Sequence, residues 1–163
     1  MLENLSLRQR ALLVFAIAAA TIVGAWIFEY FGFAPCELCL KQRWAYYAAM
    51  PIALIVAVTA PSSPGMARAG LQLLGVLWLA SMMFGIYHSG VEWKWWPGPG
   101  TCTGTGGMSG GLPDLTNPVV MCDQAAIRIV GLSLAGWNAV ISLAAAVFCF
   151  AGARRHGSSS VSQ

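Results

Sequence analysis

Long apolar stretches without a charged residue constrain this chain more than any other feature. Four of them, residues 11–28, 44–60, 69–87 and 129–151, contain no Asp, Glu, Lys or Arg. Each is close to the length of a helix that crosses a hydrocarbon core of roughly 30 Å. Only 9% of the 163 residues are charged, against about 25% in a soluble domain. The sequence therefore predicts an all-α membrane protein, a four-transmembrane-helix bundle.

The segments between these stretches set the expected topology. The turn around residues 61–68 is so short that the second and third spans must be antiparallel neighbours. Loops 29–43 and 88–128 lie together on the opposite side, and the second is longer and contains the glycine-rich segment Gly98–Gly111. Residues 154–163 are basic and then Ser-rich, which is typical of a disordered tail. Residues 1–153 are thus expected to form one membrane domain.

The first apolar stretch is interpreted as a retained helix rather than a cleaved signal peptide. A signal peptide has an apolar core of roughly 7–15 residues, followed by a cleavage site with small residues. Here the uncharged run is longer and ends in Trp26-Ile27-Phe28. A membrane helix is the better explanation.

Basic residues are distributed unevenly between the two sides. The side with both termini and the 61–68 turn carries five basic residues and one acidic residue, whereas the longer opposite side carries four and five. The positive-inside rule places both termini in the cytoplasm. In a bacterial inner membrane the opposite loops would face the periplasm. The formal net charge of +3, without a basic and aromatic cluster, gives no indication of nucleic-acid binding.

Cys36 and Cys39 are spaced C-x-x-C directly before the second apolar stretch. If a helix begins there, these two thiols and Arg43 share one face near its N-terminus. The positive end of the helix dipole and a nearby cation both favour thiolate over thiol. This pattern indicates redox or metal chemistry at the edge of the membrane.

Cys102 and Cys122 form a second, more widely spaced pair in the long loop. A structural disulfide between them could stabilise the loop by roughly 3 kcal/mol, and four cysteines could also hold zinc. The second pair lacks C-x-x-C spacing, however, and an oxidising compartment favours disulfides. Redox chemistry is the preferred interpretation, with a zinc site and a structural bridge as the alternatives.

Several other residues have simpler explanations. Cys149, inside the fourth apolar stretch, is expected to be a small apolar core residue. Asn138 is expected to form a hydrogen bond between helices. The tryptophans of Trp93–Trp96 are most typical of a membrane-interface belt.

These motifs together resemble the disulfide bond formation protein B (DsbB) family and its relative DsbI. The resemblance rests on Cys-x-x-Cys-x-x-x-Arg opening the second span and on the Trp96-Pro97-x-Pro99-x-x-Cys102 motif. Tyr87-His88-Ser89-Gly90-Val91-Glu92-Trp93 and Cys122-Asp123-Gln124 extend it over nearly the whole chain. It implies a membrane oxidoreductase that reoxidises a soluble periplasmic DsbA-type oxidase and passes the electrons to ubiquinone or menaquinone.

The resemblance also implies a role for each matching residue. Cys102 would be attacked by the partner thiolate, and Cys122 would exchange with Cys36. Cys39 would be the thiolate beside the quinone, with Arg43 as its electrostatic partner. His88 would donate a hydrogen bond to a quinone carbonyl. Gln42 stands where the family often has an acidic residue.

Overall fold

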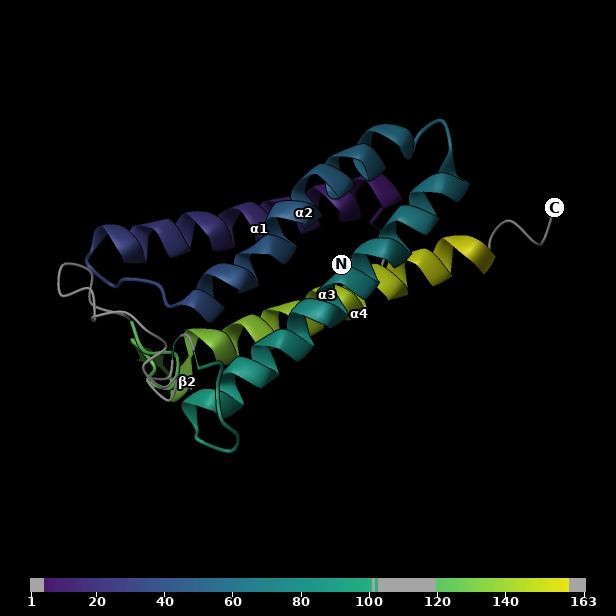
Figure 1. The fold of residues 1–163 in the computed structure, drawn as a ribbon. Helices are drawn as coiled ribbons and strands as arrows, with labels where there is room; N and C mark the ends of the chain where they lie inside the picture. The colour runs from purple at the N-terminus through teal and green to yellow at the C-terminus, as the bar shows by residue number, and fades with distance from the viewer. Residues whose placement is uncertain (1–4, 101, 103–119, 159–163) are drawn as a thin grey trace.

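The computed structural model describes residues 5–100, 102 and 120–158. Its elements are four helices and a short hairpin: α1 (Leu7–Tyr30), α2 (Glu37–Thr59), α3 (Pro64–Glu92), β1 (Arg128–Ile129), β2 (Leu132–Ser133) and α4 (Leu134–Ser158). The helices lie lengthwise against one another in an elongated bundle (Figure 1). The mostly helical fold expected from the sequence is confirmed.

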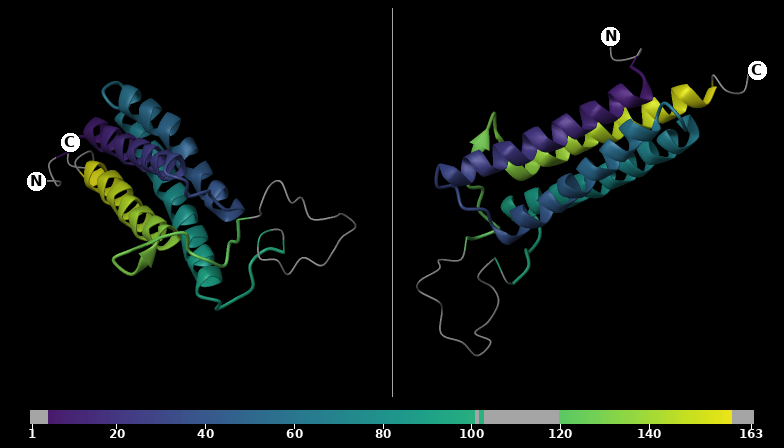
Figure 2. Two further views of the ribbon diagram at one scale, coloured as in Figure 1. Left: turned by 90° about the vertical axis from the view of Figure 1, so that its left-hand side faces the viewer. Right: turned by 90° about the horizontal axis from the view of Figure 1, so that it is seen from above.

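The two ends of the bundle differ in character. The start of α1, the end of α4 and the turn between α2 and α3 lie at one end, and the α1–α2 connection and the hairpin lie at the other (Figure 2). This arrangement matches the antiparallel topology expected from the short 61–68 turn. Which end faces the cytoplasm stays a prediction.

Three helices of the described chain are long and apolar enough to cross a membrane: α1, α3 and the Leu134–Arg154 part of α4. Helix α2 is similar in length but is not one of them. Its first half carries Lys41, Gln42 and Arg43, followed by Tyr46 and Tyr47, which lower its mean hydropathy. A bundle of four spans therefore remains a proposal that requires α2 to cross among its neighbours.

Helix α4 begins later than expected. Residues 129–133, predicted as the start of the fourth span, instead belong to an antiparallel hairpin that pairs Ile129 with Leu132. Val130 and Gly131 turn the chain with φ values of 52° and 82°, a left-handed conformation that a helix cannot include. The indole of Trp137 donates to the carbonyl of Ile129 at 2.9 Å. The hairpin is thus tied to the first turn of α4.

Two other expected boundaries also move. Helix α3 continues to Glu92, so residues 88–92, assigned to the long loop, form its last turn. Helix α4 continues to Ser158, so residues 154–158, assigned to a disordered tail, are helical. No proline interrupts either segment, and each continues the helix already in place. Most of Gly98–Gly111 lies outside the described residues.

Small side chains let the helices approach closely. Much of the buried core is alanine, including Ala11 and Ala18 of α1, Ala49 and Ala53 of α2, and Ala146 of α4, packed around the fully buried Trp78. Such residues are typical of helix contacts in membranes, where close backbone packing stabilises the pair. This core occupies the middle of the bundle.

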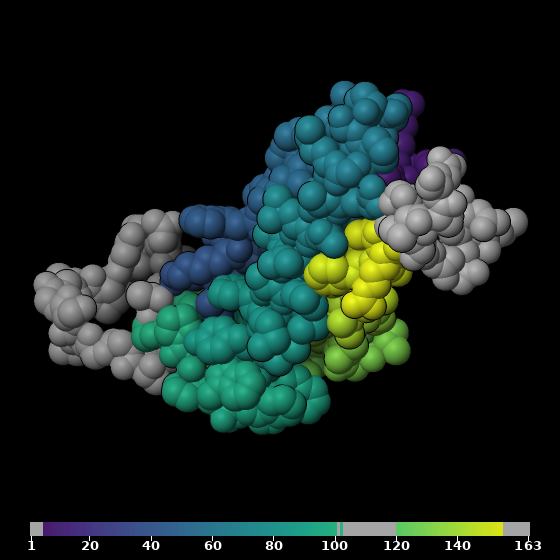
Figure 3. Space-filling view, turned by 90° about the vertical axis from the view of Figure 1, so that its right-hand side faces the viewer, coloured from purple at the N-terminus to yellow at the C-terminus, as the bar shows by residue number. Residues whose placement is uncertain are grey.

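The outward faces of the helices are apolar. Figure 3 shows the outer surfaces of α2 and α3 continuing into one another along the molecule. Large exposed side chains on these two helices include Trp44, Leu54, Ile55, Val58, Leu73, Val76 and Met83. An apolar exterior over a small-residue interior is the arrangement that a lipid environment favours.

Candidate active site

The C-x-x-C pair lies at the N-terminus of α2. Cys36 is the N-cap, with extended φ and ψ of −76° and 171°, and its Sγ accepts from the backbone N–H of Cys39 at 3.2 Å. The two sulfurs are 2.8 Å apart and not bonded. The expectation that these thiols open a helix is confirmed. At this spacing a small movement of the two side chains is enough to form a disulfide between them.

His88 of α3 reaches the same sulfur from the other side. Its Nε2 lies 3.6 Å from Cys36 Sγ, and its Nδ1 lies 2.7 Å from Nε2 of Gln42. Cys36 and His88 are 4% and 1% exposed, so water does not compete for these contacts. Helices α2 and α3 are thus joined by one imidazole between a thiol and an amide.

These contacts make the thiol of Cys36 more acidic than the thiol of Cys39. Hydrogen bonding from the Cys39 thiol lowers the pKa of Cys36 from 9.0 to about 4, against the opposing effect of burial, and the contact with His88 adds to the lowering. The same hydrogen bond, together with burial, raises the pKa of Cys39. When both cysteines are reduced, Cys36 therefore carries the negative charge.

This order differs from the expected thiolate at Cys39, and the state of the pair explains the difference. If Cys36 were bonded to another sulfur, it could no longer compete for the charge. Cys39 would then be the free sulfur of the pair. The expectation for Cys39 refers to that mixed-disulfide state.

Cys102 and Cys122 form a disulfide. Both are buried, and they belong to one packed cluster with Cys36, Leu38 and Val91. The backbone N–H of Cys122 also donates to the carbonyl of Cys102 at 2.7 Å. The structure therefore brings all four of these cysteines to one end of the bundle, although they come from three separate segments.

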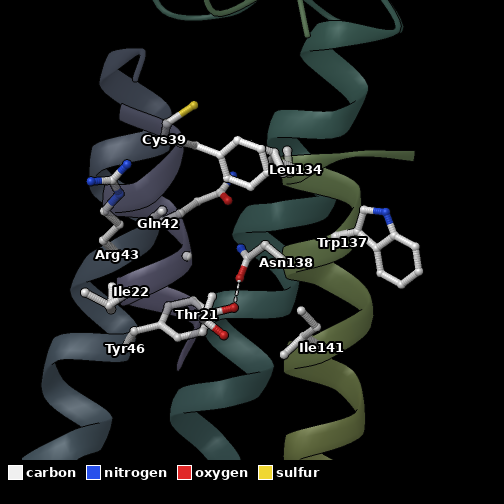
Figure 4. A pocket seen from close by; sticks show the side chains of 14 residues that line it. Thr21, Ile22, Cys39, Gln42, Arg43, Tyr46, Leu134, Trp137, Asn138 and Ile141 are labelled. Atoms are coloured by element: carbon white, nitrogen blue, oxygen red, sulfur yellow. Dashed lines mark hydrogen bonds between the residues drawn. The ribbon is translucent and has the colours of Figure 1, made fainter. Parts of the chain in front are cut away.

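A cavity of about 200 Å³ opens beside Cys39. It lies between α1, α2 and α4 and is mostly apolar (Figure 4). Polar side chains in its lining are Thr21, Gln42, Arg43, Tyr46 and Asn138. Apolar cavities of about 150 Å³ hold a benzene ring. A single ring-shaped headgroup is thus within the capacity of this one.

Arg43 lines this cavity and forms an ion pair with Glu29 of α1. Its side chain is 13% exposed, so the pair fixes a charge at the cavity wall. His88, by contrast, is not among the lining residues. Its described contacts are with Cys36, Gln42 and Glu92.

The inner wall of the cavity is a network of hydroxyls around Asn138. Its Oδ1 accepts from Tyr46 at 2.5 Å, Ser142 at 3.2 Å and Ser81 at 3.4 Å. The expected interhelical hydrogen bond of Asn138 is confirmed. Its Nδ2 is buried and has no hydrogen-bond partner among the described residues.

Sequence reasoning missed three of these residues. Gln42, Tyr46 and Glu29 were not assigned to a site, yet they hold His88, Asn138 and Arg43. A signal existed for Tyr46, which lies seven residues after Cys39 and so returns to the same face of a helix. Nothing in the sequence indicates which residue of α3 faces Gln42.

Comparison with known proteins identifies relatives. The family model described as "Disulfide bond formation protein DsbB" matches residues 7–152. "Disulfide bond formation protein B" of Azoarcus sp. (strain BH72) is 29% identical over 137 residues, 78% of this chain and 80% of the relative.

An uncharacterized protein of Rickettsia prowazekii (strain Madrid E) is 25% identical over 145 residues, 84% of this chain and 82% of the relative. No solved structure matches the chain significantly. The family match spans α1 to most of α4, including the four clustered cysteines. This chain therefore belongs to the DsbB family, whose members act as membrane oxidoreductases in disulfide bond formation.

Proposed function

We propose that this protein reoxidises a periplasmic DsbA-type dithiol oxidase and transfers the electrons to a membrane quinone. The observation that carries the proposal is the position of Cys36 and Cys39. Cys36 packs against the Cys102–Cys122 disulfide, and Cys39 lines the apolar cavity. The two thiols therefore lie between a disulfide and a cavity of the size that a ring requires.

The cysteines would act by four successive exchanges. A partner thiolate attacks Cys102, and Cys122 leaves with the electron pair. Cys122 then attacks Cys36 of an oxidised Cys36–Cys39 pair and releases Cys39 as a thiolate. The second partner thiolate closes the partner's own disulfide and frees Cys102. Cys102 attacks Cys122, re-forms their disulfide and releases Cys36.

Two electrons then remain on Cys36 and Cys39, which is the arrangement that this structure has. The partner's dithiol has become a disulfide, so the exchanges balance. A bound quinone would accept these two electrons with two protons. Cys39 and Arg43 would hold its ring, because they line the cavity and offer a sulfur and a cation.

A strong electron acceptor is needed because the partner is itself a strong oxidant. The DsbA couple lies at about −120 mV, well above ordinary structural disulfides below about −300 mV. For a two-electron couple, about 30 mV corresponds to 1.4 kcal/mol, so a quinone some 200 mV more positive would supply roughly 9 kcal/mol. An apolar cavity next to the thiols meets this need, because quinones are dissolved in the bilayer.

A metal site is the second candidate. The ligand atoms of Cys36, Cys39 and His88 lie within 4.8 Å of one another. Two zinc–sulfur bonds of about 2.3 Å at a tetrahedral angle would hold the sulfurs about 3.8 Å apart. The observed 2.8 Å is shorter, which favours sulfur–sulfur chemistry over a shared ion.

We also propose the inner membrane as the location, with both termini cytoplasmic and α2 as the fourth span. The loop end would then face the periplasm, where a soluble partner can reach Cys102. This orientation follows from the distribution of basic residues and from the end of the bundle that the start of α1 and the end of α4 share (Figure 2).

The deciding experiment is quinone reduction by the purified protein. A reduced DsbA-type donor and a short-chain ubiquinone or menaquinone analogue are mixed with the protein, and quinone absorbance is followed. We expect turnover that requires both the donor and the four cysteines. Absence of turnover with either analogue, in a protein that retains the Cys102–Cys122 disulfide, would overturn the proposal.

A further inference from the structure

The structure gives His88 a contact that a quinone ligand does not need. Its Nε2 points to Cys36 at 3.6 Å and its Nδ1 to Gln42 at 2.7 Å, and the side chain is 2% exposed. Water therefore cannot reach either ring nitrogen and does not determine which of them is protonated. The partners of the ring therefore decide where the proton sits.

We propose that Gln42 is a positioning residue that fixes His88 as the neutral tautomer with its proton on Nε2, directed at the Cys36 thiolate. The group of Gln42 that faces the ring is its amide nitrogen, which can only donate. Nδ1 must then accept and carries no proton. The remaining ring proton lies on Nε2 and is donated to Cys36 Sγ.

This assignment has a consequence for the exchange cycle, and that part rests on the proposed function. In the last exchange Cys102 attacks Cys122, and the Cys36–Cys122 bond breaks with its electron pair on Cys36. A thiolate that is stabilised leaves faster. His88 would stabilise the departing sulfur by a hydrogen bond and would transfer no proton to it.

Other charged groups near His88 do not change the assignment. On α2 the neighbouring titratable group is Cys39, which shares its hydrogen with Cys36. On α3 it is Glu92, whose Oε1 lies 3.9 Å from Nε2, with Arg128 of β1 near that carboxylate. Glu92 thus lies on the Nε2 side of the ring, beyond hydrogen-bond distance. Among the described residues, Gln42 alone has a hydrogen-bonding contact with Nδ1.

A carboxylate at the position of Gln42 would have a different effect on the ring. A carboxylate accepts a hydrogen bond from Nδ1–H and stabilises a doubly protonated imidazolium. The Gln42 amide donates and keeps the ring neutral.

The test measures the tautomer directly. The whole reduced protein, with ¹⁵N-labelled histidine in detergent micelles, is examined by long-range ¹H–¹⁵N NMR, in which protonated and bare ring nitrogens have distinct shifts. The chain has two histidines, and a His156→Gln variant assigns the signals. We expect His88 to be protonated on Nε2 alone at pH 7. A proton on Nδ1, alone or on both nitrogens, would overturn the proposal without the need for any other variant.

A reactivity assay provides the second readout. In a Cys39→Ser/Cys149→Ser protein Cys36 is the remaining thiol, because Cys102 and Cys122 stay bonded. Its alkylation rate should follow a single transition with pH. Gln42→Glu should add a second inflection, as an imidazolium loses its proton, and Lys41→Gln, an exposed neighbour, should not. An unchanged profile in Gln42→Glu contradicts the proposal.

In the same Cys39→Ser/Cys149→Ser protein, His88→Phe should raise the pH midpoint of Cys36 alkylation by about one pH unit or more, the usual effect of losing a hydrogen bond to a charged group. Neither readout uses quinone or the partner. A protein with the expected tautomer that does not reduce quinone would refute the proposed function alone. Turnover with the wrong tautomer would refute this inference alone.

Discussion

Cys36 and Cys149 are both free and both buried, yet their surroundings have little in common. Cys36 is 4% exposed and Cys149 is fully buried. Cys36 contacts Cys39 and His88 through its sulfur. Cys149 lies in the apolar core and has no hydrogen-bond partner among the described residues. Burial alone thus does not make a thiol reactive. The hydrogen-bond partners of its sulfur determine whether it is reactive.

Removing the sulfur next to the cavity should have the largest effect. We expect Cys39→Ser to abolish quinone reduction by a reduced donor, because the Cys36–Cys39 disulfide can no longer form. Quinone absorbance measures this directly. Normal turnover in that variant would contradict the proposed electron transfer through Cys36 and Cys39. Retention of the Cys102–Cys122 disulfide in the variant is the control that its fold is intact.

The pH dependence of alkylation should give the second-largest difference between Cys36 and Cys149. A thiol reacts as its thiolate, so lowering the pH through its pKa removes the reactivity. We expect alkylation of Cys36 to stay near its maximal rate from pH 8 to about 5 and to fall below about pH 4, the pKa set by Cys39 and His88.

The rate is measured in the parent protein, with mass spectrometry to locate the label on Cys36 or Cys149. Wild-type Cys149 is the internal comparison and should stay unlabelled in the folded protein at every pH. A decline in Cys36 labelling that already begins near pH 8 would mean that its contacts do not stabilise the thiolate.

Arg43→His should have a moderate effect on quinone use. The shorter side chain breaks the ion pair with Glu29 and moves a charge away from the cavity. We expect the apparent KM for quinone to rise several-fold with a smaller change in kcat. Glu29→Gln, which keeps the guanidinium, is the matched control and should have the smaller effect. Equal KM values in all three proteins would exclude a quinone role for Arg43.

Tyr46→Phe tests the wall of the cavity through stability. The change removes one buried hydrogen bond to Asn138, and such a bond is worth about 1 kcal/mol. A lower unfolding temperature in detergent is therefore expected, with the cysteines still able to exchange. A variant as stable as the parent would show that the remaining serines satisfy Asn138 without Tyr46.

The smallest effect is expected at Cys149. Cys149→Ser should leave quinone reduction unchanged, because the sulfur lies in the core and outside the cysteine cluster. Turnover at the parent rate completes the comparison with Cys36. A loss of turnover in a stably folded variant would give Cys149 a redox role that its surroundings do not explain.

Much of this arrangement could be predicted because it depends on neighbours in sequence. The positions of Cys36 and Cys39 at a helix start follow from the motif and the apolar stretch behind it. The antiparallel pair α2 and α3 follows from a turn too short for anything else. These features are local, so the order of residues is sufficient to define them.

The contacts between helices could not be predicted in the same way. His88 is 52 residues from Cys36, and only the rotation of α3 about its axis decides which of its side chains faces α2. The hairpin at residues 128–133 was missed because an uncharged run hides the left-handed turn at Val130 and Gly131. The weak apolar character of α2 was missed because its charges were counted as part of the preceding loop.

The close approach of α3 and α4 has a consequence for the thiols. A Cβ on Gly85 would lie 2.9 Å from the backbone nitrogen of Ala139, so even alanine there would push the two helices apart. Gly85 is three residues before His88 and on the same side of α3. A shift of a few tenths of an ångström at this glycine would move His88 with α3 and would change the distance from its imidazole to the Cys36 sulfur. Gly85 therefore sets the spacing of a redox centre that it does not touch.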